Sequence, residues 1–332
     1  MVNLTADRIQ LALIKNVVWP ILVVTFLLFL LLLPETFSQS RNITFLLASS
    51  AGLSLIVLAE SLCLLSGHFD LSIAAIATFS AMVAAKVMVN IPAFSGLTTA
   101  LLGIAVILAV GGMIGLLNGI SIAKLGVNPF LQTLSFLIIF EGAVIWVSAR
   151  SIYQLPDSYL WLGSESLKFL SMSIPVSIFF MLGMFLVSGL VLKYTRFGRS
   201  IYAVGGDMDS AGKAGIRTDR IVIGVFILSG MLGGMSGWVT TGFIGAATPK
   251  LANQMLFPAF AATVIGGVSI FGGRGSVIGA LGGVLMLATI QTGLSMLQLD
   301  PFIVNMVNGS VLLAAVLVFT FLERYRSIVL AQ

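Results

Sequence analysis

Apolar stretches about as long as a membrane is thick recur along the whole of this chain. Only 9% of its 332 residues are charged, against about 25% in soluble domains. A helix crosses the bilayer core with about 20 residues, and only helices and closed barrels satisfy the backbone there. The sequence therefore predicts an all-α integral membrane protein with about ten transmembrane helices. The predicted spans are 17–33, 43–65, 70–89, 98–123, 131–149, 173–193, 221–243, 255–271, 276–295 and 302–322.

The distribution of Lys and Arg predicts the orientation in the membrane. Cytoplasmic loops of membrane proteins carry an excess of both residues. With a cytoplasmic N-terminus and ten spans, twelve of the seventeen basic residues fall on the inner side and five on the outer side. We therefore expect both termini in the cytoplasm, together with the highly charged loop 194–220. The polar and aromatic loop 150–172 is expected outside.

Two similar segments of the chain lead into the fifth and the tenth predicted spans. Asn-Gly-Ile-Ser at 118–121 precedes Asn-Pro-Phe at 128–130, and Thr-Gly-Leu-Ser at 292–295 precedes Asp-Pro-Phe at 300–302. Asn or Asp before Pro is a favourable helix start, because the side chain caps the helix and Pro fits its first turn. The two Pro-Phe pairs begin spans that are five apart, so these spans cross the membrane in opposite directions. This arrangement is typical of transporters with inverted repeats. We expect two inverted halves, although two unrelated helix caps would give the same pattern.

Three carboxylates fall at the expected depth of the membrane, namely Glu60, Asp70 and Glu141. A charge at this depth is costly and faces a cavity, a partner or the interface. Thr133 and Glu141 are eight residues apart in the fifth span, which Gln132 begins, so about two helical turns place them on one face. Such groups either line a solute pathway or hold the bundle together through interhelical hydrogen bonds.

The residue chemistry of an enzyme or a metalloprotein is missing from the sequence. The single Cys63 excludes a disulfide framework and a zinc cluster, and the single His68 needs further ligands to build a metal site. The phosphate-binding pattern Gly-x-x-x-x-Gly-Lys-Ser/Thr is absent, and Gly-Gly-Arg-Gly-Ser at 272–276 is expected to form a tight inner turn. We expect no catalytic residue, no metal and no bound cofactor. The net charge of +5 reflects helix ends rather than nucleic-acid binding.

Four short segments recur at separations typical of one group of membrane proteins. They are Ser-Gly-His-Phe-Asp-Leu-Ser at 66–72, Asn-Gly at 118–119 with Asn-Pro-Phe-Leu-Gln-Thr-Leu at 128–134, Thr-Arg-Phe-Gly-Arg-Ser-Ile-Tyr-Ala-Val-Gly-Gly-Asp at 195–207 with Ala-Gly-Ile at 214–216, and Val-Ile-Gly-Gly-Val-Ser at 264–269 with Gly-Gly-Arg-Gly-Ser at 272–276. In this order they resemble the permease subunits of bacterial ABC importers of the ribose, xylose and autoinducer-2 type, in the branched-chain amino acid/sugar permease superfamily. The resemblance covers residues 40–322.

The resemblance implies that residues 1–332 form one transmembrane permease domain of an ATP-driven importer in the bacterial cytoplasmic (inner) membrane. A small polar solute, foremost a monosaccharide, would arrive on a periplasmic or lipid-anchored binding protein. A second permease chain would complete the pathway, and a cytoplasmic ABC ATPase subunit would bind ATP and Mg. Membrane lipid would surround the permease, and the permease would bind no nucleic acid. Candidate pathway residues are Asp70, Ser72, Asn118, Gln132, Thr133 and Glu141.

The resemblance also implies that loop 194–220 carries a short coupling helix that docks into the ATPase. Gly205 and Gly206 are expected to form a turn, with Asp207 as the helix cap that follows it. The helix itself is expected at 211–215, ended by glycine. The candidate coupling residues are Arg196, Gly198, Arg199, Gly205, Gly206, Asp207, Ala211 and Gly215.

The sequence departs from the family pattern near the expected pathway. His68 stands where a second glycine is usual, and Ala74-Ala75 replaces a glycine-containing stretch. The solute therefore stays open among pentoses, hexoses, deoxysugars, autoinducer-2 and nucleosides, and the permease pair is either homomeric or heteromeric. An alternative is an ion-gradient-driven secondary transporter, which would use Glu60, Asp70 and Glu141 directly.

Overall fold

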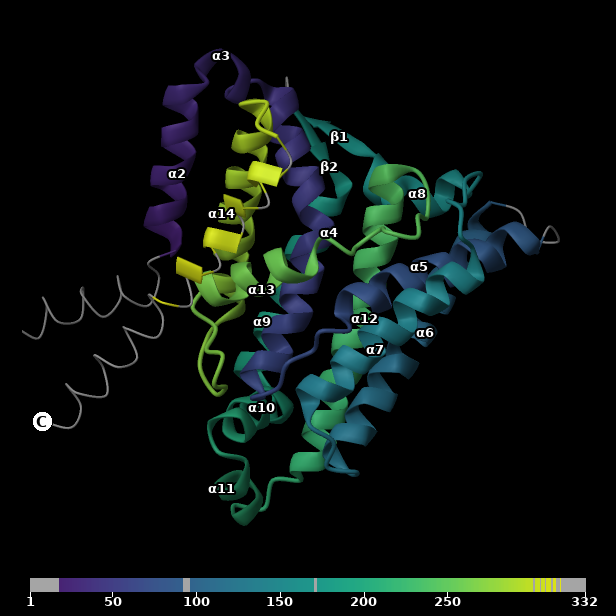
Figure 1. Ribbon diagram of the computed structural model, residues 1–332, viewed down its shortest axis with the longest axis vertical. Helices are drawn as coiled ribbons and strands as arrows, with labels where there is room; N and C mark the ends of the chain where they lie inside the picture. Colours follow the sequence, from purple (N-terminus) through teal and green to yellow (C-terminus); the bar gives the residue numbers. More distant parts are fainter. Residues whose placement is uncertain are drawn as a thin grey trace, which may run out of the picture.

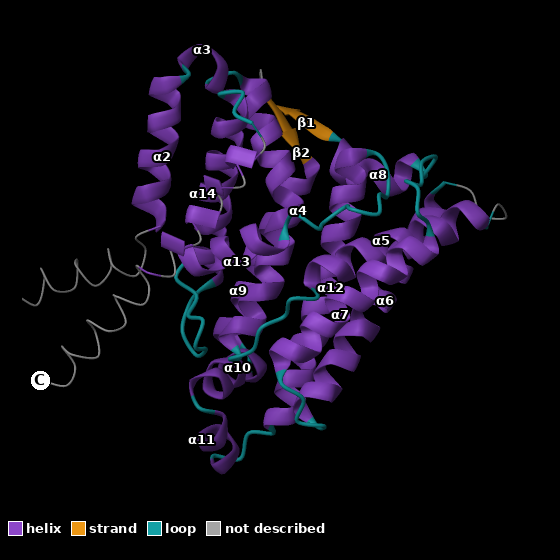
Figure 2. Cartoon of the chain, in the orientation of Figure 1, coloured by secondary structure: helices purple, strands orange, loops and turns teal. Residues whose placement is uncertain are grey.

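The computed structural model describes residues 18–91, 96–169, 172–300 and parts of 302–317 (Figure 1). This described part is a bundle of helices, and its strands form a single short hairpin (Figure 2). The predicted all-α class is confirmed. The elements are α2 (Val18–Leu32), α3 (Pro34–Phe37), α4 (Ser40–Leu65), α5 (Ile73–Asn90), α6 (Leu97–Ala123), α7 (Pro129–Val147), α8 (Asp157–Ser164), β1 (Ser166–Phe169), β2 (Met172–Pro175), α9 (Val176–Tyr194), α10 (Arg196–Gly206), α11 (Met208–Lys213), α12 (Thr218–Ile244), α13 (Leu256–Ile265) and α14 (Val277–Met296).

Seven of the described helices are long and apolar enough to cross a membrane. They are α4, α5, α6, α7, α9, α12 and α14. Three shorter apolar helices correspond to the other predicted spans, namely α2, α13 and Phe302–Val311, the last of which includes residues outside the described set. The membrane-spanning character of the chain is thus confirmed, and the count of ten stays a prediction.

Helix α12 lies at the centre of the bundle, where it crosses α4, α5 and α6. A methyl group at Gly115 of α6 would overlap the carbonyl oxygen of Phe226 in α12, and one at Gly230 would overlap that of Gly111. Small residues let two membrane helices approach this closely. Across the other face of α12, Ser236 Oγ donates to the carbonyl oxygen of Gly52 in α4 over 2.7 Å. Glycines four residues apart, at 111 and 115 in α6 and at 230 and 234 in α12, thus allow the helices of this bundle to pack tightly.

Helix α13 is shorter than the predicted span 255–271. It ends at Ile265, because Gly266 packs its backbone against Ala280 of α14 and Gly267 follows with φ +81°. A methyl group at Gly266 would meet the Ala280 Cα atom. Ten helical residues reach about 15 Å, about half of a bilayer core. The segment after α13 returns through the glycine turn 272–276, where Gly272, Gly273 and Gly275 all have positive φ, as predicted for a tight turn.

The two ends of the bundle differ in structure. Helices α10 and α11 gather at one end, and α3, α8 and the hairpin gather at the other (Figure 1). Segment 150–172, expected outside, contains α8 and β1, and β1 pairs antiparallel with β2. Thr44 of α4 donates its hydroxyl to Ser173 O over 2.6 Å, and Ile152 pairs with Ala247. These contacts fix the segment onto the ends of neighbouring helices, which the sequence pattern does not reveal.

Both helix starts of the sequence repeat have the expected cap. Asn128 Oδ1 accepts hydrogen bonds from the backbone N–H groups of Phe130 (2.9 Å) and Leu131 (3.3 Å). Asp300 Oδ1 accepts from the backbone N–H of Phe302 over 3.0 Å. The predicted capping is confirmed, and the inverted relation of the two halves stays a prediction.

Candidate functional site

The turn between α4 and α5 carries a fully buried carboxylate, Asp70. Asp70 Oδ1 accepts hydrogen bonds from the backbone N–H and the hydroxyl of Ser72, over 3.0 Å and 2.5 Å. Asp70 Oδ2 accepts from Ser229 Oγ of α12 over 3.0 Å. A buried carboxylate without such donors is costly. The two bonds from Ser72 stabilise the turn itself, and the bond from Ser229 holds the turn against α12 at the centre of the bundle.

The hydrogen-bond chain continues through two further helices. Asn118 of α6 donates from Nδ2 to Ser72 Oγ over 2.9 Å, and Gln132 of α7 donates from Nε2 to Asn118 Oδ1 over 3.4 Å. Asn118 is fully buried and Gln132 is partly exposed. Four of the six candidate pathway residues thus form one network, together with Ser229. We refer to Gln132, Asn118, Ser72, Asp70 and Ser229 as the polar chain.

The other two candidate pathway residues lie apart from the polar chain. Thr133 is buried and donates its hydroxyl to Pro129 O of its own helix over 2.8 Å. Glu141 is exposed on α7 and accepts from Asn253 Nδ2 over 3.3 Å. Glu141 is therefore accessible at the surface of this chain, whereas Thr133 is enclosed by it.

Two more ionisable residues lie beside the polar chain. Glu60 of α4 is 3% exposed and close enough to Asp70 for the two carboxylates to interact. Its Oε1 atom has no hydrogen-bond partner within the described residues. His68 is buried, with Nδ1 2.8 Å from Ser66 O and its ring edge-on to Phe226 at 5.9 Å. Nδ1 thus bonds to Ser66, and among the described residues no direct hydrogen bond joins His68 to Asp70.

The predicted coupling segment folds into two helices. Thr195 Oγ1 caps α10 by accepting from Gly198 N over 3.0 Å, and Asp207 Oδ1 caps α11 by accepting from Ser210 N over 2.6 Å. The bonds from Ser210 lower the pKa of the exposed Asp207 carboxyl. The prediction of Asp207 as a cap is confirmed.

Two other expectations for this segment were wrong. Gly205 and Gly206 lie in the last turn of α10 instead of a free turn, because Gly205 packs tightly on neighbouring backbone. The following helix spans Met208–Lys213 rather than 211–215, since its cap lies at Asp207. Gly215 follows the helix with φ +86°, a left-handed conformation that favours glycine.

Three separate chain segments meet at Gly205. A methyl group there would overlap the carbonyl oxygen of Leu65, at the end of α4, and approach the backbone nitrogen of Gly273 to 2.7 Å. Gly273 N itself donates to Leu65 O over 3.0 Å. Leu65 lies directly before the turn that carries Asp70. The end of α10 is therefore packed against the base of the turn that anchors the polar chain.

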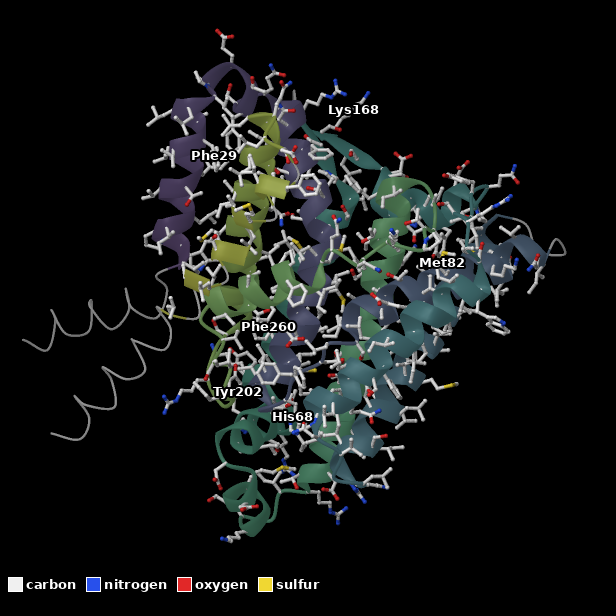
Figure 3. The ribbon with its side chains drawn as sticks, in the orientation of Figure 1. Phe29, His68, Met82, Lys168, Tyr202 and Phe260 are labelled. Atoms are coloured by element: carbon white, nitrogen blue, oxygen red, sulfur yellow. The ribbon has the colours of Figure 1, made fainter. Side chains whose placement is uncertain are left out.

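Figure 3 supports this placement, with His68 of the Asp70 turn and Tyr202 of α10 labelled near the same end of the bundle and Lys168 at the opposite end. Tyr202 donates its hydroxyl to Gly275 O over 3.1 Å. Helix α10 thus contacts both the α4–α5 turn and the α13–α14 turn.

A small cavity with both apolar and polar lining residues opens between α4, α13 and α14; we call it the polar cavity because hydroxyl and amide groups interrupt its largely apolar wall. Its volume is about 210 Å³, below the roughly 300 Å³ of ordinary drug-sized pockets. The lining includes the hydroxyls of Ser49, Ser50 and Thr292 and the amides of Gln254 and Gln291. Ser49 and Ser50 donate to carbonyls of their own helix over 3.1 and 2.8 Å, so each hydroxyl oxygen can still accept a hydrogen bond. The remaining lining residues are Phe45, Leu53, Met255, Pro258, Ala288 and Ser295.

Comparison with known proteins assigns this architecture to a family. Residues 42–320 match the model of the branched-chain amino acid transport system / permease component. The chain belongs to this permease family. The permease is 34% identical to the D-allose transport system permease protein of Escherichia coli over 284 residues, which are 85% of this chain and 84% of that protein.

Two further relatives match along a similar length. The L-arabinose ABC transporter permease protein of Azospirillum brasilense is 33% identical, covering 85% of this permease and 80% of its own length. The ribose import permease protein of Bacillus subtilis is 32% identical, over 86% of this permease and 87% of its own length. No solved structure matches the permease significantly. The resemblance recognised in the sequence is confirmed.

Sequence reasoning missed two parts of the permease site. Ser229 is not among the predicted residues; it lies in the glycine-rich stretch of α12, a pattern that indicates helix packing and not a polar site. Thr292 and Ser295 were noted only as members of the repeat, although both line the polar cavity. A hydroxyl or amide group in an otherwise apolar span is the sequence signal that could have identified Ser229, Thr292 and Ser295.

Proposed function

We propose that this permease is the membrane-spanning subunit of an ATP-driven importer of a monosaccharide in the bacterial cytoplasmic membrane. The observation that carries the proposal is the alignment with sugar-importer permeases over at least four fifths of both chains. The relatives are named for allose, arabinose, fructose and ribose. All four are monosaccharides, which is the solute class carried over to this chain.

The polar cavity supports this solute class. It combines the aromatic ring of Phe45 with hydroxyl and amide groups in about 210 Å³. A sugar offers several hydroxyl groups, which donate to and accept from side chains of this kind. The described residues that line the cavity include no acidic or basic side chain, so this lining favours a neutral solute over an amino acid or another ion.

In this proposal the permease has ten spans in two inverted halves, with both termini in the cytoplasm. It places α10 and α11 inside the cell and Lys168 outside. The excess of basic residues around α10 supports this orientation. The polar cavity then lies in the outer half of the membrane, where a periplasmic or lipid-anchored binding protein would deliver the sugar.

A second permease chain, identical or related, completes the pathway in this proposal. Helix α7 supports pairing at its face, because it buries only Thr133 and Val144 within this chain. Ile138 and Trp146 of α7 are 63% and 88% exposed. Glu141 on the same helix would then border the space between the two permeases.

The chain itself carries out no bond chemistry in this proposal. ATP and Mg belong to a separate cytoplasmic ATPase, which docks on α10 and α11. Arg196 and Arg199 are exposed on α10 and available to such a partner. Movement of α10 would reach the Asp70 turn through the contact of Gly205 with Leu65, and a rearrangement of the polar chain would follow.

Reconstituted transport tests the proposal. The permease is co-expressed with its ATPase, purified, and placed in proteoliposomes with the binding protein and radiolabelled allose, arabinose, fructose or ribose. We expect uptake of at least one sugar that requires ATP. Uptake driven by a proton or sodium gradient without an ATPase would overturn the proposal and favour a secondary transporter. ATP-dependent uptake of an amino acid instead of any sugar would refute the solute class alone.

A further inference from the structure

A second, larger cavity lies on the flank of the bundle between α9, α10 and α14. Its volume is about 560 Å³, which is more than twice that of the polar cavity. One wall consists of Leu182, Leu186 and Leu190 of α9, and the facing wall includes Ile278 and Leu281 of α14. Leu186 and Ile278 are 64% and 63% exposed. The cavity is therefore an apolar groove that opens to the surroundings of the bundle.

The length of this groove matches one leaflet of a bilayer. On α9 its lining runs from Leu182 to Lys193, which is about 16 Å of helix. One half of the hydrocarbon core measures about 15 Å. The groove thus extends from mid-membrane to the end of the bundle where α10 lies.

The end of the groove near α10 is polar and positively charged. Lys193 lies in the last turn of α9 with its Nζ atom 5.2 Å from the centre of the Tyr194 ring. Arg199 donates from Nη1 to Tyr194 O over 3.3 Å, which brings a second cation to this end. Tyr202 and Ser276, the N-cap of α14, complete the lining. No acidic side chain is found among the described residues that line the groove.

We propose that this groove is a specific site for an anionic phospholipid of the leaflet on the α10 side. One acyl chain lies between the leucines of α9 and the apolar face of α14, and the phosphate lies at Lys193. Two arguments select this occupant over bulk lipid. The surface is concave along a whole leaflet, and its cations lie at headgroup depth, where basic pockets between membrane helices attract anionic lipids. Tyrosine is also favoured at this interface.

A lipid bound in this groove would directly contact α10, which belongs to the predicted coupling segment 194–220. Tyr202 of α10 lines the groove and donates its hydroxyl to Gly275 O, one residue before the N-cap of α14. A bound lipid therefore adds contacts that hold α10 against α14. This connects the lipid composition of the membrane to the position of α10.

Native mass spectrometry of the purified permease tests the site, with phosphatidylglycerol and phosphatidylcholine of identical acyl chains as probes. We expect phosphatidylglycerol to bind more tightly. Lys193→Gln should reduce its affinity by about fivefold. Lys124→Gln is the matched control, because Lys124 is also exposed at the inner end of a long helix, α6, but does not line the groove. Inorganic phosphate should not displace the lipid.

A second pair of variants tests the apolar part of the groove. Leu190→Trp fills the groove and should lower the occupancy of both lipids, whereas Leu117→Trp on α6 should not, although both leucines are 47% exposed. Equal binding of the two lipids, or equal effects of Lys193→Gln and Lys124→Gln, would overturn the proposal. Exclusion of lipid from the groove by a second protein chain in the assembled importer would overturn it as well.

Discussion

Ser229 Oγ on α12 donates a 3.0 Å hydrogen bond to Asp70 Oδ2 in the turn before α5. Both residues are fully buried, and they lie more than 150 positions apart in the sequence. This bond joins the central helix of the bundle to the turn from which the polar chain continues to Asn118 and Gln132. Its loss should loosen the turn without altering the surface of the permease.

Replacement of Ser229 by alanine should therefore lower thermal stability. Interhelical hydrogen bonds in membranes contribute about 0.6 kcal/mol on average and about 1.7 kcal/mol at most. We expect a decrease in the free energy of unfolding within this range, measured by the thermal unfolding of the purified permease in mild detergent. Ser135→Ala is the control, because Ser135 is exposed and donates only to Leu131 O of its own helix. Equal stability of the two variants would show that the bond to Asp70 contributes nothing.

Two neighbouring glycines in α10 should respond very differently to alanine. Gly205→Ala places a methyl group against the backbone of Leu65 and Gly273, whereas Gly206→Ala meets nothing within 4 Å. Forcing an extra group into close packing costs about 1–3 kcal/mol. We expect Gly205→Ala to reduce ATP-dependent transport and to expose residues 194–220 to protease, and Gly206→Ala to do neither. If both variants transport normally, α10 does not act through this contact.

Glu141 should matter for transport and little for stability. It is exposed on α7, and its hydrogen bond from Asn253 is 3.3 Å long. Hydrogen bonds to a charged group contribute about 1.5–3 kcal/mol, so loss of one to a solute corresponds to about tenfold or more in rate. We expect Glu141→Ala to lower uptake by this amount and to unfold at the same temperature as the unmodified permease. Normal uptake by Glu141→Ala would remove this residue from the pathway.

The polar cavity should determine how well the sugar is held. Gln291→Leu removes an amide from its lining while the side chain stays similar in size. A neutral hydrogen bond contributes about 0.5–1.5 kcal/mol, which corresponds to an increase of about 2–10-fold in the half-saturating sugar concentration. The measurement is uptake over a range of sugar concentrations. Ser310→Ala is the control, because Ser310 does not line the cavity and donates to Met306 O of its own helix. A change that is equal in both variants would argue against a solute site here.

The cap of α11 should tolerate asparagine but not alanine. Asp207 Oδ1 accepts from Ser210 N, and asparagine caps helices about as well as aspartate. We expect Asp207→Ala to weaken co-purification of the ATPase and Asp207→Asn to preserve it. Because hydrogen bonds from Ser210 lower the pKa of Asp207, the cap stays charged at pH values below the usual titration range of Asp. Its contribution disappears only as the pH falls through that lowered pKa. Asp209→Asn, in the same helix turn, is the control.

The amino-acid sequence by itself determined the membrane character, three helix caps and the family. Long apolar stretches leave no alternative to membrane helices, and the caps at Asn128, Asp207 and Asp300 depend only on neighbouring backbone N–H groups. Such signals are local, so a single segment of sequence contains them completely. The grouping of Asp70, Ser72, Asn118 and Gln132 as candidates also followed from the sequence, through the resemblance to a family.

Only the tertiary structure decided which of these residues meet. The bond between Asp70 and Ser229, the contact of Gly205 with Leu65 and the walls of both cavities join segments that are distant in the sequence. Those contacts depend on how α12 crosses α4 and α6, which is set by packing over whole helix faces. The early end of α13 has the same origin, because Gly266 packs against Ala280 of another helix. Helical periodicity determines which side chains share a face, and the close approach of backbones determines which face each one meets.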